Sequence, residues 1–345
     1  MLDPMKLEDY DFALPTDLVA QYPAPQRDQS RLLVLNRAEA SIQHLHFKDI
    51  VDFLGPFDAL VVNQTRVVKA RLRGVRVGTG AEVELLLIRQ EGDYWLAMGR
   101  PGRRLSPGTR VELAGGRLHA VIVGRAPRGR FLVDFEEEDV AGLIEAAGEI
   151  PLPPYIDRRP DEEDSRRYQT VFAQHAGAIA APTASLHFTL PLLEEIESRG
   201  TRVVPLVLHV GPGTFEPVRT NDPRQHRLEP EYYEVSEDSV AALRHCRRQG
   251  GRIIAVGTTV VRTLETIAGS TGEPQAACGW TEKFIYPPYE FNTVEALVTN
   301  FHLPRSSLLL LVAAFAGRER ILEAYKTAVA EGYRFYSYGD AMLLL

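Results

Sequence analysis

The chain has 345 residues, of which 45% are hydrophobic and 25% charged, and its formal net charge is −7. These proportions are typical of a soluble globular protein, and the length exceeds that of one ordinary core and predicts two domains. The net charge argues against a protein that is basic over its whole surface.

Cysteine usage and the apolar runs indicate a cytoplasmic protein. Cys246 and Cys278 stand alone without CxxC spacing, so a disulfide framework and a cysteine-based zinc site are not expected. The stretch from Met1 to Tyr10 is charged and has no apolar region of the kind that a secretory signal needs. The longest apolar run, Leu308 to Ala316, is far shorter than the ~20 residues of a membrane span.

Basic residues are concentrated in one segment. Between Arg66 and Arg130 there are fourteen Lys or Arg against five Asp or Glu, so this segment carries a formal +9 and the remainder −16. Such asymmetry is what a nucleic-acid-facing surface on an acidic body would produce. The alternative is a compositional preference, because thirty-four arginines accompany only five lysines in the whole chain.

The N-terminal part has α/β character. Leu14 to Gln21 is predicted to be a short helix with Thr16 as its N-cap. Two short apolar runs, Arg31–Asn36 and Ala59–Asn63, indicate buried strands, and the amphipathic stretch from Phe47 to Leu54 between them indicates a helix.

The sequence pattern changes after Asn63, where turns rich in Gly, Pro or Arg separate short apolar runs. Six strands are predicted, at Val67–Val77, Glu82–Ile88, Asp93–Met98, Arg110–Leu113, Leu118–Val123 and Arg130–Asp134. Strands this short and this closely spaced predict a small antiparallel barrel or sandwich. Residues 67–150 are therefore expected to form an inserted, basic β-barrel domain.

Strands and helices alternate again in the rest of the chain. Helices are predicted at Asp139–Gly148, Leu190–Arg199, Ser236–Gln249, Val260–Ala268, Ser306–Phe315 and Arg318–Glu331. Strands are predicted at Thr201–Val210, Arg252–Val256 and Ala296–Thr299. This alternation predicts a mostly parallel sheet flanked by helices, with residues 1–66 and 151–345 forming one discontinuous α/β domain.

Four short segments combine Gly or Pro with hydroxyl, imidazole or amide groups. They are Ala181–Phe188, His209–Phe215, Val256–Thr259 followed by Arg262, and Thr299–Ser306. Glycine and proline hold such turns in a fixed shape, and the last three segments follow strands. In α/β folds the loops after the strands carry the site, so one polar pocket built from all four segments is expected.

Each polar group in these segments has a structural alternative. The turn at Gly257, Thr258 and Thr259 offers hydroxyl and backbone N–H groups to an anion at a helix N-terminus, but Thr also serves as an ordinary N-cap. His187, His209 and His302 can each act as an acid or a base, or can simply order its loop.

Two further groups of residues could contribute to a site. His226, Glu229 and Glu231 lie close in sequence and could join a metal site, but no HxH or HExxH spacing supports this and no metal is expected. In the aromatic-rich stretches near residues 284 and 335, the phenylalanines are assigned to the core. The pocket candidates there are Tyr286, Tyr289 and Tyr338.

Taken together, these segments resemble the S-adenosylmethionine:tRNA ribosyltransferase-isomerase family of queuosine biosynthesis. The resemblance extends from the N-terminal region to the C-terminus. Besides the four segments, it rests on Asp11–Pro15, Gln21–Pro23, Arg27, Ser30–Leu33, Asn63–Val67, Glu149–Ile156, Arg167–Val171, Glu231–Tyr233, Phe284–Pro287 and Tyr336–Met342.

The resemblance implies an activity and its substrates. S-adenosylmethionine would serve as a ribosyl donor to 7-aminomethyl-7-deazaguanine at the wobble position of a tRNA anticodon stem-loop. Transfer and isomerisation would give epoxyqueuosine and release adenine and methionine. The resemblance also implies an α/β domain with an inserted β-barrel. No cofactor beyond S-adenosylmethionine as co-substrate, no membrane contact and a monomeric protein are expected.

The resemblance also implies which residues of this chain form the site. Candidates for proton transfers are His187, His209, His302, Glu231 and Asp340. Candidates for binding S-adenosylmethionine are Thr183, Gly211, Gly213, Thr214, Gly257, Thr258, Thr259, Arg262, Tyr286 and Asn300. Candidates for binding RNA phosphates are Arg66, Lys69, Arg71, Arg73, Arg76, Arg103 and Arg104. Which base serves which proton transfer stays open.

The chain departs from the family pattern in one loop that matters. Where the family usually has His-x-Met-His-Ser-Glu, this chain has His226-Arg-Leu-Glu-Pro-Glu231, so Glu229 replaces a histidine and Pro230 a serine. Smaller departures are Ser185, Pro212, Val260 and Pro288. The altered loop motivates the alternative of a paralogue with another substrate or no activity, such as an inactive RNA-binding protein. A metal hydrolase is a more remote, separate alternative.

Overall fold

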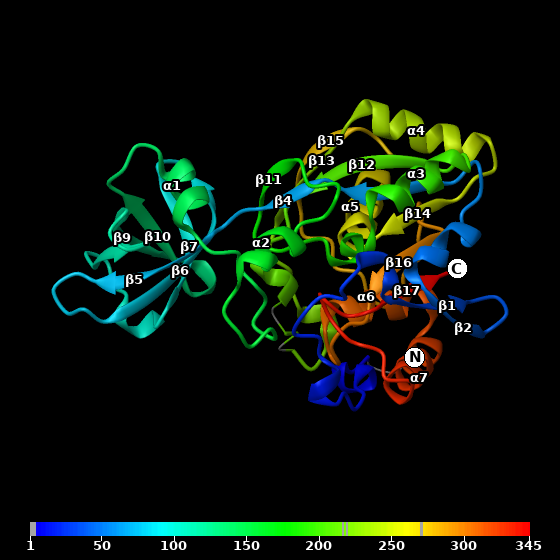
Figure 1. The fold of residues 1–345 in the computed structure, drawn as a ribbon, viewed down its shortest axis with the longest axis horizontal. Helices are drawn as coiled ribbons and strands as arrows, with labels where there is room; N and C mark the ends of the chain where they lie inside the picture. Colours follow the sequence, from blue (N-terminus) through cyan, green and yellow to red (C-terminus); the bar gives the residue numbers. More distant parts are fainter. Residues whose placement is uncertain (1–4, 216, 219, 270–271) are drawn as a thin grey trace.

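A nine-stranded mixed sheet forms the centre of the larger lobe (Figure 1). The computed structural model describes residues 5–215, 217–218, 220–269 and 272–345. The strands lie in the order β15 (Ala277–Thr281), β13 (Glu231–Val235), β12 (Arg202–Leu208), β3 (Ala59–Asn63), β14 (Ile253–Val256), β16 (Ala296–Asn300), β17 (Ala341–Leu344), β1 (Arg31–Asn36) and β2 (Ser41–His46). Strands β12, β3, β14 and β16 are mutually parallel, and antiparallel pairs flank them.

Alternation of side chains along the strands gives the sheet two apolar faces. In β1, for example, Leu33 and Leu35 face one core while Leu32 and Val34 face the other. The first face is covered by α4 (Glu237–Arg248), α5 (Thr258–Ala268), α6 (Ser307–Ala316) and α7 (Arg318–Ala330). The second is covered by α3 (Leu190–Ser198) and the 3₁₀ segments η4 (Phe47–Phe53) and η7 (Thr183–His187). The larger lobe therefore has three layers, with the sheet in the middle and helical segments on both of its faces.

The smaller lobe is a closed antiparallel barrel of six strands (Figure 1). Its strands are β5 (Arg71–Arg76), β6 (Glu82–Glu91), β7 (Tyr94–Arg100), β8 (Arg110–Leu113), β9 (Leu118–Ala126) and β10 (Arg130–Phe135). Helix α1 (Val140–Ala147) packs on the barrel core through Ile144. At Gly74 the strands lie so close that a Cβ would be 1.9 Å from the carbonyl oxygen of Glu112, so the β5–β8 pair requires glycine there.

The two lobes are joined around β4 (Thr65–Val67), which pairs in parallel with β11 (His175–Ala178). Shortly after α2 (Glu162–Arg167), the side chain of Gln169 hydrogen-bonds the backbone N–H and carbonyl of Val67 in β4 at 3.0 and 2.6 Å. A salt bridge crosses between the lobes, because Nη2 of Arg130 in the barrel lies 2.6 Å from Oε1 of Glu229. The exact domain limits, 67–150 for the insert, stay a prediction.

The predicted fold class is confirmed, with corrections at the N-terminal end. All six barrel strands and the six later helices are present. Leu14–Gln21 is not a helix: only Thr16–Leu18 forms a 3₁₀ turn, and Pro15, not Thr16, precedes it. Phe47–Phe53 is a 3₁₀ helix, and seven residues are too few for a stable α-helix without strong packing. Sequence reasoning missed the strands β2, β4, β11, β13, β15 and β17 and the helix α2.

Candidate functional site

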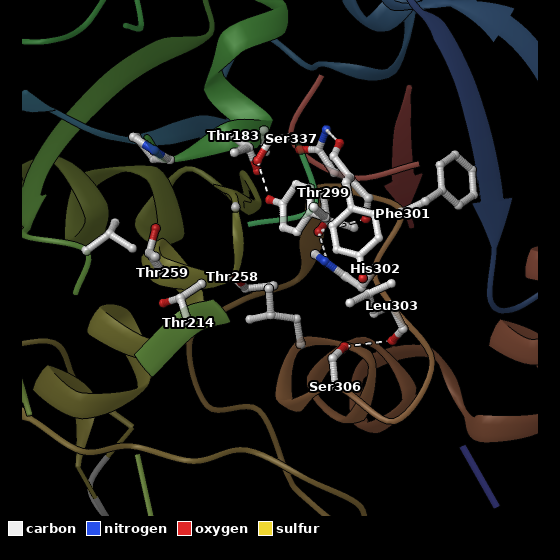
Figure 2. A pocket seen from close by; sticks show the side chains of 18 of the residues that line it. Thr183, Thr214, Thr258, Thr259, Thr299, Phe301, His302, Leu303, Ser306 and Ser337 are labelled. Carbon is white, nitrogen blue, oxygen red and sulfur yellow. Dashed lines mark hydrogen bonds between the residues drawn. The ribbon is translucent and has the colours of Figure 1, made fainter. Parts of the chain in front are cut away.

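All four predicted segments line one cavity of about 400 Å³, here called the donor cavity. Thr183 comes from the first segment, Thr214 from the second, Thr258 and Thr259 from the third, and His302 from the fourth. Figure 2 shows these side chains, with Ser337, around a common space. The sequence prediction of a single pocket built from these loops is therefore confirmed.

The cavity lies at the carboxyl ends of parallel strands. Strand β14 ends at Val256 and leads through Gly257 into α5, while the neighbouring strand β16 ends at Asn300 and leads to His302. Gly257 has φ +97°, a left-handed conformation that side chains rarely adopt, and this allows the sharp turn from strand to helix. The first backbone N–H groups of α5 have no partner within the helix and lie at the cavity wall.

Three buried polar atoms of the cavity wall have no hydrogen-bond partner within the described part of the chain. They are Oδ1 of Asn300, Oγ1 of Thr259 and the hydroxyl of Tyr336. Asn300 is otherwise fixed, because its Nδ2 donates to the carbonyl of Tyr336 at 3.1 Å. Burying a polar atom without a partner costs free energy, so these atoms mark a place where a polar ligand binds.

Tyr336 is a cavity residue that the sequence prediction of individual site residues missed. Its φ of +74° places a bulky side chain in the left-handed region, which is an uncommon and strained conformation. Its ring packs 4.1 Å from that of Tyr155, whose hydroxyl lies 2.6 Å from Oγ of Ser337. The closing motif Tyr336–Met342 was the available signal, but sequence alone does not show its backbone conformation.

His302 is the predicted histidine that lines the donor cavity. Its Nε2 lies 2.8 Å from Oγ1 of Thr299, and its backbone N–H donates to the hydroxyl of Tyr325 at 3.0 Å. Burial lowers the pKa of His302 to about 3, so the ring is neutral near pH 7.

His187 lies beside the donor cavity but is held on both ring nitrogens. Its Nδ1 is 2.7 Å from Oγ of Ser30, and its Nε2 is 3.2 Å from Nδ2 of Asn300. Since Ser30 Oγ donates to the carbonyl of Arg27, the network assigns the ring proton to Nδ1. Burial lowers the pKa of His187 to about 3. These contacts support a structural role in positioning Asn300, and its predicted role in proton transfer stays a prediction.

These two buried histidines make folding stability dependent on pH. Their folded-state pKa values of about 3 lie below the unfolded value of about 6.5, so the unfolded chain binds more protons between those limits. Stability is therefore expected to fall as pH decreases from about 6.5 towards 3. Each histidine adds up to about 1.4 kcal/mol per pH unit to the slope.

The variant His187→Asn is expected to unfold with a shallower pH dependence than the parent chain, by about one proton. The free energy of unfolding in urea, measured at intervals from pH 5 to 6.5, gives the slope directly. The matched control is His245→Asn on α4, because His245 is exposed. Equal slopes for His187→Asn and the parent chain would show that His187 does not stay neutral in the fold.

His209 lies not at the donor cavity but at a second cavity of about 410 Å³, here called the junction cavity, between the barrel and the α/β lobe. Its Nδ1 is 2.8 Å from Oγ1 of Thr65, and its ring stacks 5.7 Å from that of Tyr232. Burial, followed by the proximity of His175, lowers its pKa. Val210, the next residue, lines both cavities.

Glu231 and Arg262, which were predicted to serve in proton transfer and in donor binding, form a buried ion pair with each other. Oε2 of Glu231 pairs with Nη1 of Arg262, and Oε1 accepts from the backbone N–H of Gly211 at 2.8 Å and from Thr214 Oγ1 at 3.3 Å. Arg262 Nε donates to the carbonyl of Lys283 at 2.8 Å. Glu231 and Gly211 line the junction cavity, whereas Arg262 lines neither cavity. The structure favours a supporting role for this pair.

Three other predicted residues lie away from both cavities. Asp340 is buried, and its carboxylate accepts from the backbone N–H groups of Arg31 at 3.0 Å and Arg334 at 2.8 Å. Tyr286 packs against Phe284, and Gly213 lies in a turn next to Glu229. The contacts of Asp340 account for its burial without a catalytic role, and its predicted role in proton transfer stays a prediction.

The altered loop is firmly attached to the barrel. Glu229, which takes the place of the usual family histidine, accepts from Arg130 and lines the junction cavity. His226 packs against the ring of Phe284. Among the described residues no group of three or more His, Cys, Asp or Glu is arranged to hold a metal ion.

The basic residues of the barrel fall into two classes. Several are engaged within the protein: Arg66 pairs with Glu145, Arg71 donates to the carbonyl of Leu152, and Arg73 pairs with both Glu84 and Glu149. Lys69 also donates to a backbone carbonyl, that of Glu145. Arg103 and Arg104 are exposed, and Arg76 is partly buried.

A basic groove follows one side of the barrel. It consists of two adjoining cavities of about 630 and 920 Å³ that share Arg73, Arg100, Arg159 and Glu84, the partner of Arg73. Arg100 and Arg159, which were not among the predicted RNA-binding residues, are exposed and make no side-chain hydrogen bond or ion pair within the described part of the chain. The groove ends at Pro212 and Pro217, beside the donor cavity.

The fold and the cavity define an α/β protein with a ligand cavity at the carboxyl edge of its sheet and a barrel with a basic groove attached. A family model described as queuosine biosynthesis protein matches residues 7–344, and the chain belongs to this family.

The most similar proteins agree with this assignment. A protein of Moorella thermoacetica named S-adenosylmethionine:tRNA ribosyltransferase-isomerase is 51% identical and aligns over 99% of this chain and 100% of its own length. A protein of the same name from Pelotomaculum thermopropionicum is 50% identical over 99% and 100%. The crystal structure of S-adenosylmethionine tRNA ribosyltransferase from Thermotoga maritima matches with a TM-score of 0.56, at 40% identity, over 98% of this chain and 100% of that one.

Proposed function

We propose that this chain is an enzyme that transfers and isomerises the ribosyl group of S-adenosylmethionine onto 7-aminomethyl-7-deazaguanine in the wobble position of a tRNA. The products are epoxyqueuosine in the tRNA, adenine and methionine. The observation that carries the proposal is the donor cavity, because all four segments of the family resemblance build it and three of its buried polar atoms have no partner among the described residues.

The donor cavity fits S-adenosylmethionine in chemistry. Asn300 Oδ1 can accept from an amino group, and the hydroxyls of Thr259 and Tyr336 can bind nitrogen or ribose oxygen atoms. The N-terminus of α5 at Thr258 suits the methionine carboxylate, because free N–H groups and the helix dipole favour an anion. Arg262 is held by Glu231, and Arg305, which lines the cavity, is paired with Asp11, so the helix N-terminus is the proposed anion site.

The chemistry requires a proton to leave the ribose carbon next to the sulfonium. A pKa of about 3 keeps His302 neutral but makes it a weak base near neutral pH. We therefore assign His302 a hydrogen-bonding role towards the donor, and the base for this step stays open. No cofactor beyond S-adenosylmethionine enters this proposal.

The basic groove is the proposed path of the tRNA backbone. Exposed guanidinium groups bind phosphates, and the groove ends next to the cavity where the wobble base would react. A monomeric state and a cytoplasmic location complete the proposal. No helix in the described ranges has the length and apolar character needed to cross a membrane.

The test is the release of adenine from S-adenosylmethionine, with tRNA carrying the aminomethyl base, with tRNA carrying guanine, and without tRNA. Release that depends on the modified tRNA is the expected result. Binding of the modified tRNA with no adenine release would contradict the proposed activity and favour an inactive or divergent RNA-binding relative.

The variant Tyr336→Phe is expected to bind S-adenosylmethionine up to about tenfold more weakly, because one neutral hydrogen bond contributes about 0.5–1.5 kcal/mol. Its thermal stability should stay close to that of the parent chain, since the hydroxyl has no partner within the described part of the protein. Isothermal titration calorimetry measures the affinity. The control Tyr333→Phe removes a hydroxyl that contacts His44 outside the cavity. Unchanged affinity for Tyr336→Phe would place the donor elsewhere.

A further inference from the structure

The junction cavity is distinct from the donor cavity in position and in lining. It lies between β6, β7 and α1 of the barrel and β11, β13, β15 and the loop after β12 in the larger lobe. It is about as large as the donor cavity, and the two meet at Val210. A molecule in the junction cavity would therefore lie one loop away from a molecule in the donor cavity.

Aromatic rings and carboxylates give this cavity its chemical character. Trp95 enters from the barrel, and Tyr232 and Trp280 come from the larger lobe. Trp280 is 55% exposed, although the Arg89 guanidinium lies 5.1 Å from its ring centroid and Tyr232 packs edge-on against it at 5.8 Å. Glu229 and Glu231 also line the cavity; each is ion-paired with an arginine, Arg130 and Arg262, and each carboxylate can accept further hydrogen bonds.

The cationic side chains of this cavity are already paired. Arg66 pairs with Glu145 and Arg89 with Glu91. The cavity is thus suited to a flat, hydrogen-bond-donating or cationic group, while the basic groove on the other side of Pro212 is suited to phosphates.

His209 lines the cavity with its ring packed against the backbone of β11. A Cβ built on Gly177 would lie 2.7–2.8 Å from Cδ2, Nε2 and Cε1 of His209, so only glycine lets the ring pack this closely. Nδ1 of the same ring is fixed by Thr65, and no partner for Nε2 is found in the described part of the structure. Nε2 therefore lies where it can contact a ligand.

We propose that the junction cavity binds the acceptor: a purine-like base that is turned out of the RNA and carries a primary ammonium group. The ring stacks on the aromatic side chains, and a carboxylate accepts from its N–H groups. One proton passes from the ammonium nitrogen to Nε2 of His209, which leaves a neutral amine and an imidazolium. The amine then faces the donor cavity past Val210. This assignment rests on the proposed function and selects His209 for this step from the five candidates for proton transfer.

The test uses a variant whose larger side chain fills the junction cavity from the barrel side. Ala141 lines it from α1 and is exposed, so Ala141→Phe should occupy the cavity without disturbing a core. The matched control is Ala146→Phe on the same helix, because Ala146 is exposed but does not line the cavity. Two synthetic anticodon stem-loops serve as probes, one with 7-aminomethyl-7-deazaguanine and one with guanine at the wobble position.

Ala141→Phe is expected to bind the modified stem-loop at least tenfold more weakly than the parent chain and to lose its preference over the guanine stem-loop. Affinity for S-adenosylmethionine should be unchanged, and Ala146→Phe should resemble the parent chain. Trp280→Ala, a second variant at an exposed position, is expected to weaken binding of the modified stem-loop about fivefold or more through lost stacking.

The outcomes separate this inference from the proposed function. If the parent chain releases adenine and both Ala141→Phe and Trp280→Ala retain full preference for the modified stem-loop, the acceptor assignment is overturned while the activity stands. If the parent chain releases no adenine, the proposed function fails. Stem-loop binding still decides the acceptor assignment: a preference that Ala141→Phe erases supports the junction cavity, and equal affinity for both stem-loops rejects it.

Discussion

Replacing Glu231 with Gln is expected to lower the midpoint of thermal unfolding by roughly 10 °C. Glu231 and Arg262 have side chains that are only 4% and 5% exposed. The substitution would leave the guanidinium charge buried without its counter-charge. Breaking a buried ion pair in this way costs about 3–5 kcal/mol, far more than the loss of a surface pair.

Two further variants make this result specific. Glu234→Gln lies on the same strand, β13, but is exposed, so its midpoint should change little. The double variant Glu231→Leu with Arg262→Met removes both charges and should recover most of the lost stability. A Glu231→Gln protein with normal stability and no adenine release would contradict the supporting role and indicate that Glu231 takes part in the reaction.

Reversing the charges of Arg100 and Arg159 together is expected to weaken tRNA binding at least a hundredfold at low salt. Both guanidinium groups are exposed in the basic groove. Each lost phosphate contact removes one released counterion, so the slope of log affinity against log salt should become shallower by about 2. Fluorescence anisotropy titrations at several salt concentrations measure both quantities.

The control for this prediction carries the same change in net charge elsewhere. Arg248→Glu with Lys326→Glu alters exposed positions on α4 and α7, outside the groove, and should bind tRNA nearly as the parent chain does. Substitutions at Arg71 and Arg73, two of the RNA-binding candidates from the sequence, would also break contacts with Glu84 and Glu149. A loss of tRNA binding in those variants would not be separable from a loss of folding stability. Unchanged affinity and salt slope for Arg100→Glu with Arg159→Glu would show that the tRNA backbone does not bind in this groove.

Sequence reasoning succeeded where a local pattern determines structure. Alternating or continuous apolar runs placed the six barrel strands and the strands β3, β12, β14 and β16. The rule that loops after parallel strands build the site then brought the four segments to one cavity. Short strands with mixed composition, such as β13 (Glu231–Val235), were missed because neighbouring strands, not their own pattern, stabilise them.

Sequence reasoning identified polar residues near the site but not their partners. Arg262 was assigned to the binding of S-adenosylmethionine, yet Glu231 from a distant part of the chain pairs with it. His187 and His302 have the residue type of a general base, but burial lowers both pKa values to about 3. Tertiary contacts and burial decide both points, and neither can be deduced from the spacing of residues along one chain.

The separation of the three histidines between cavities is also a property of the folded chain. His302 lines the donor cavity, His209 lines the junction cavity, and His187 lies between Ser30 and Asn300. In sequence all three occur in similar loop motifs. Only the barrel, by closing over His209 and Tyr232, creates the second cavity and so distinguishes His209 from the others.

The most direct test of the central claim follows the atoms of the donor. The protein is incubated with modified tRNA and with S-adenosylmethionine that carries ¹³C throughout its ribose and none in its methyl group. The tRNA is then digested to nucleosides and measured by mass spectrometry. Ribosyl transfer predicts that all of the ribose label appears in the wobble nucleoside, with unlabelled adenine released. A nucleoside that gains only an unlabelled methyl group, or no mass at all, would contradict the account.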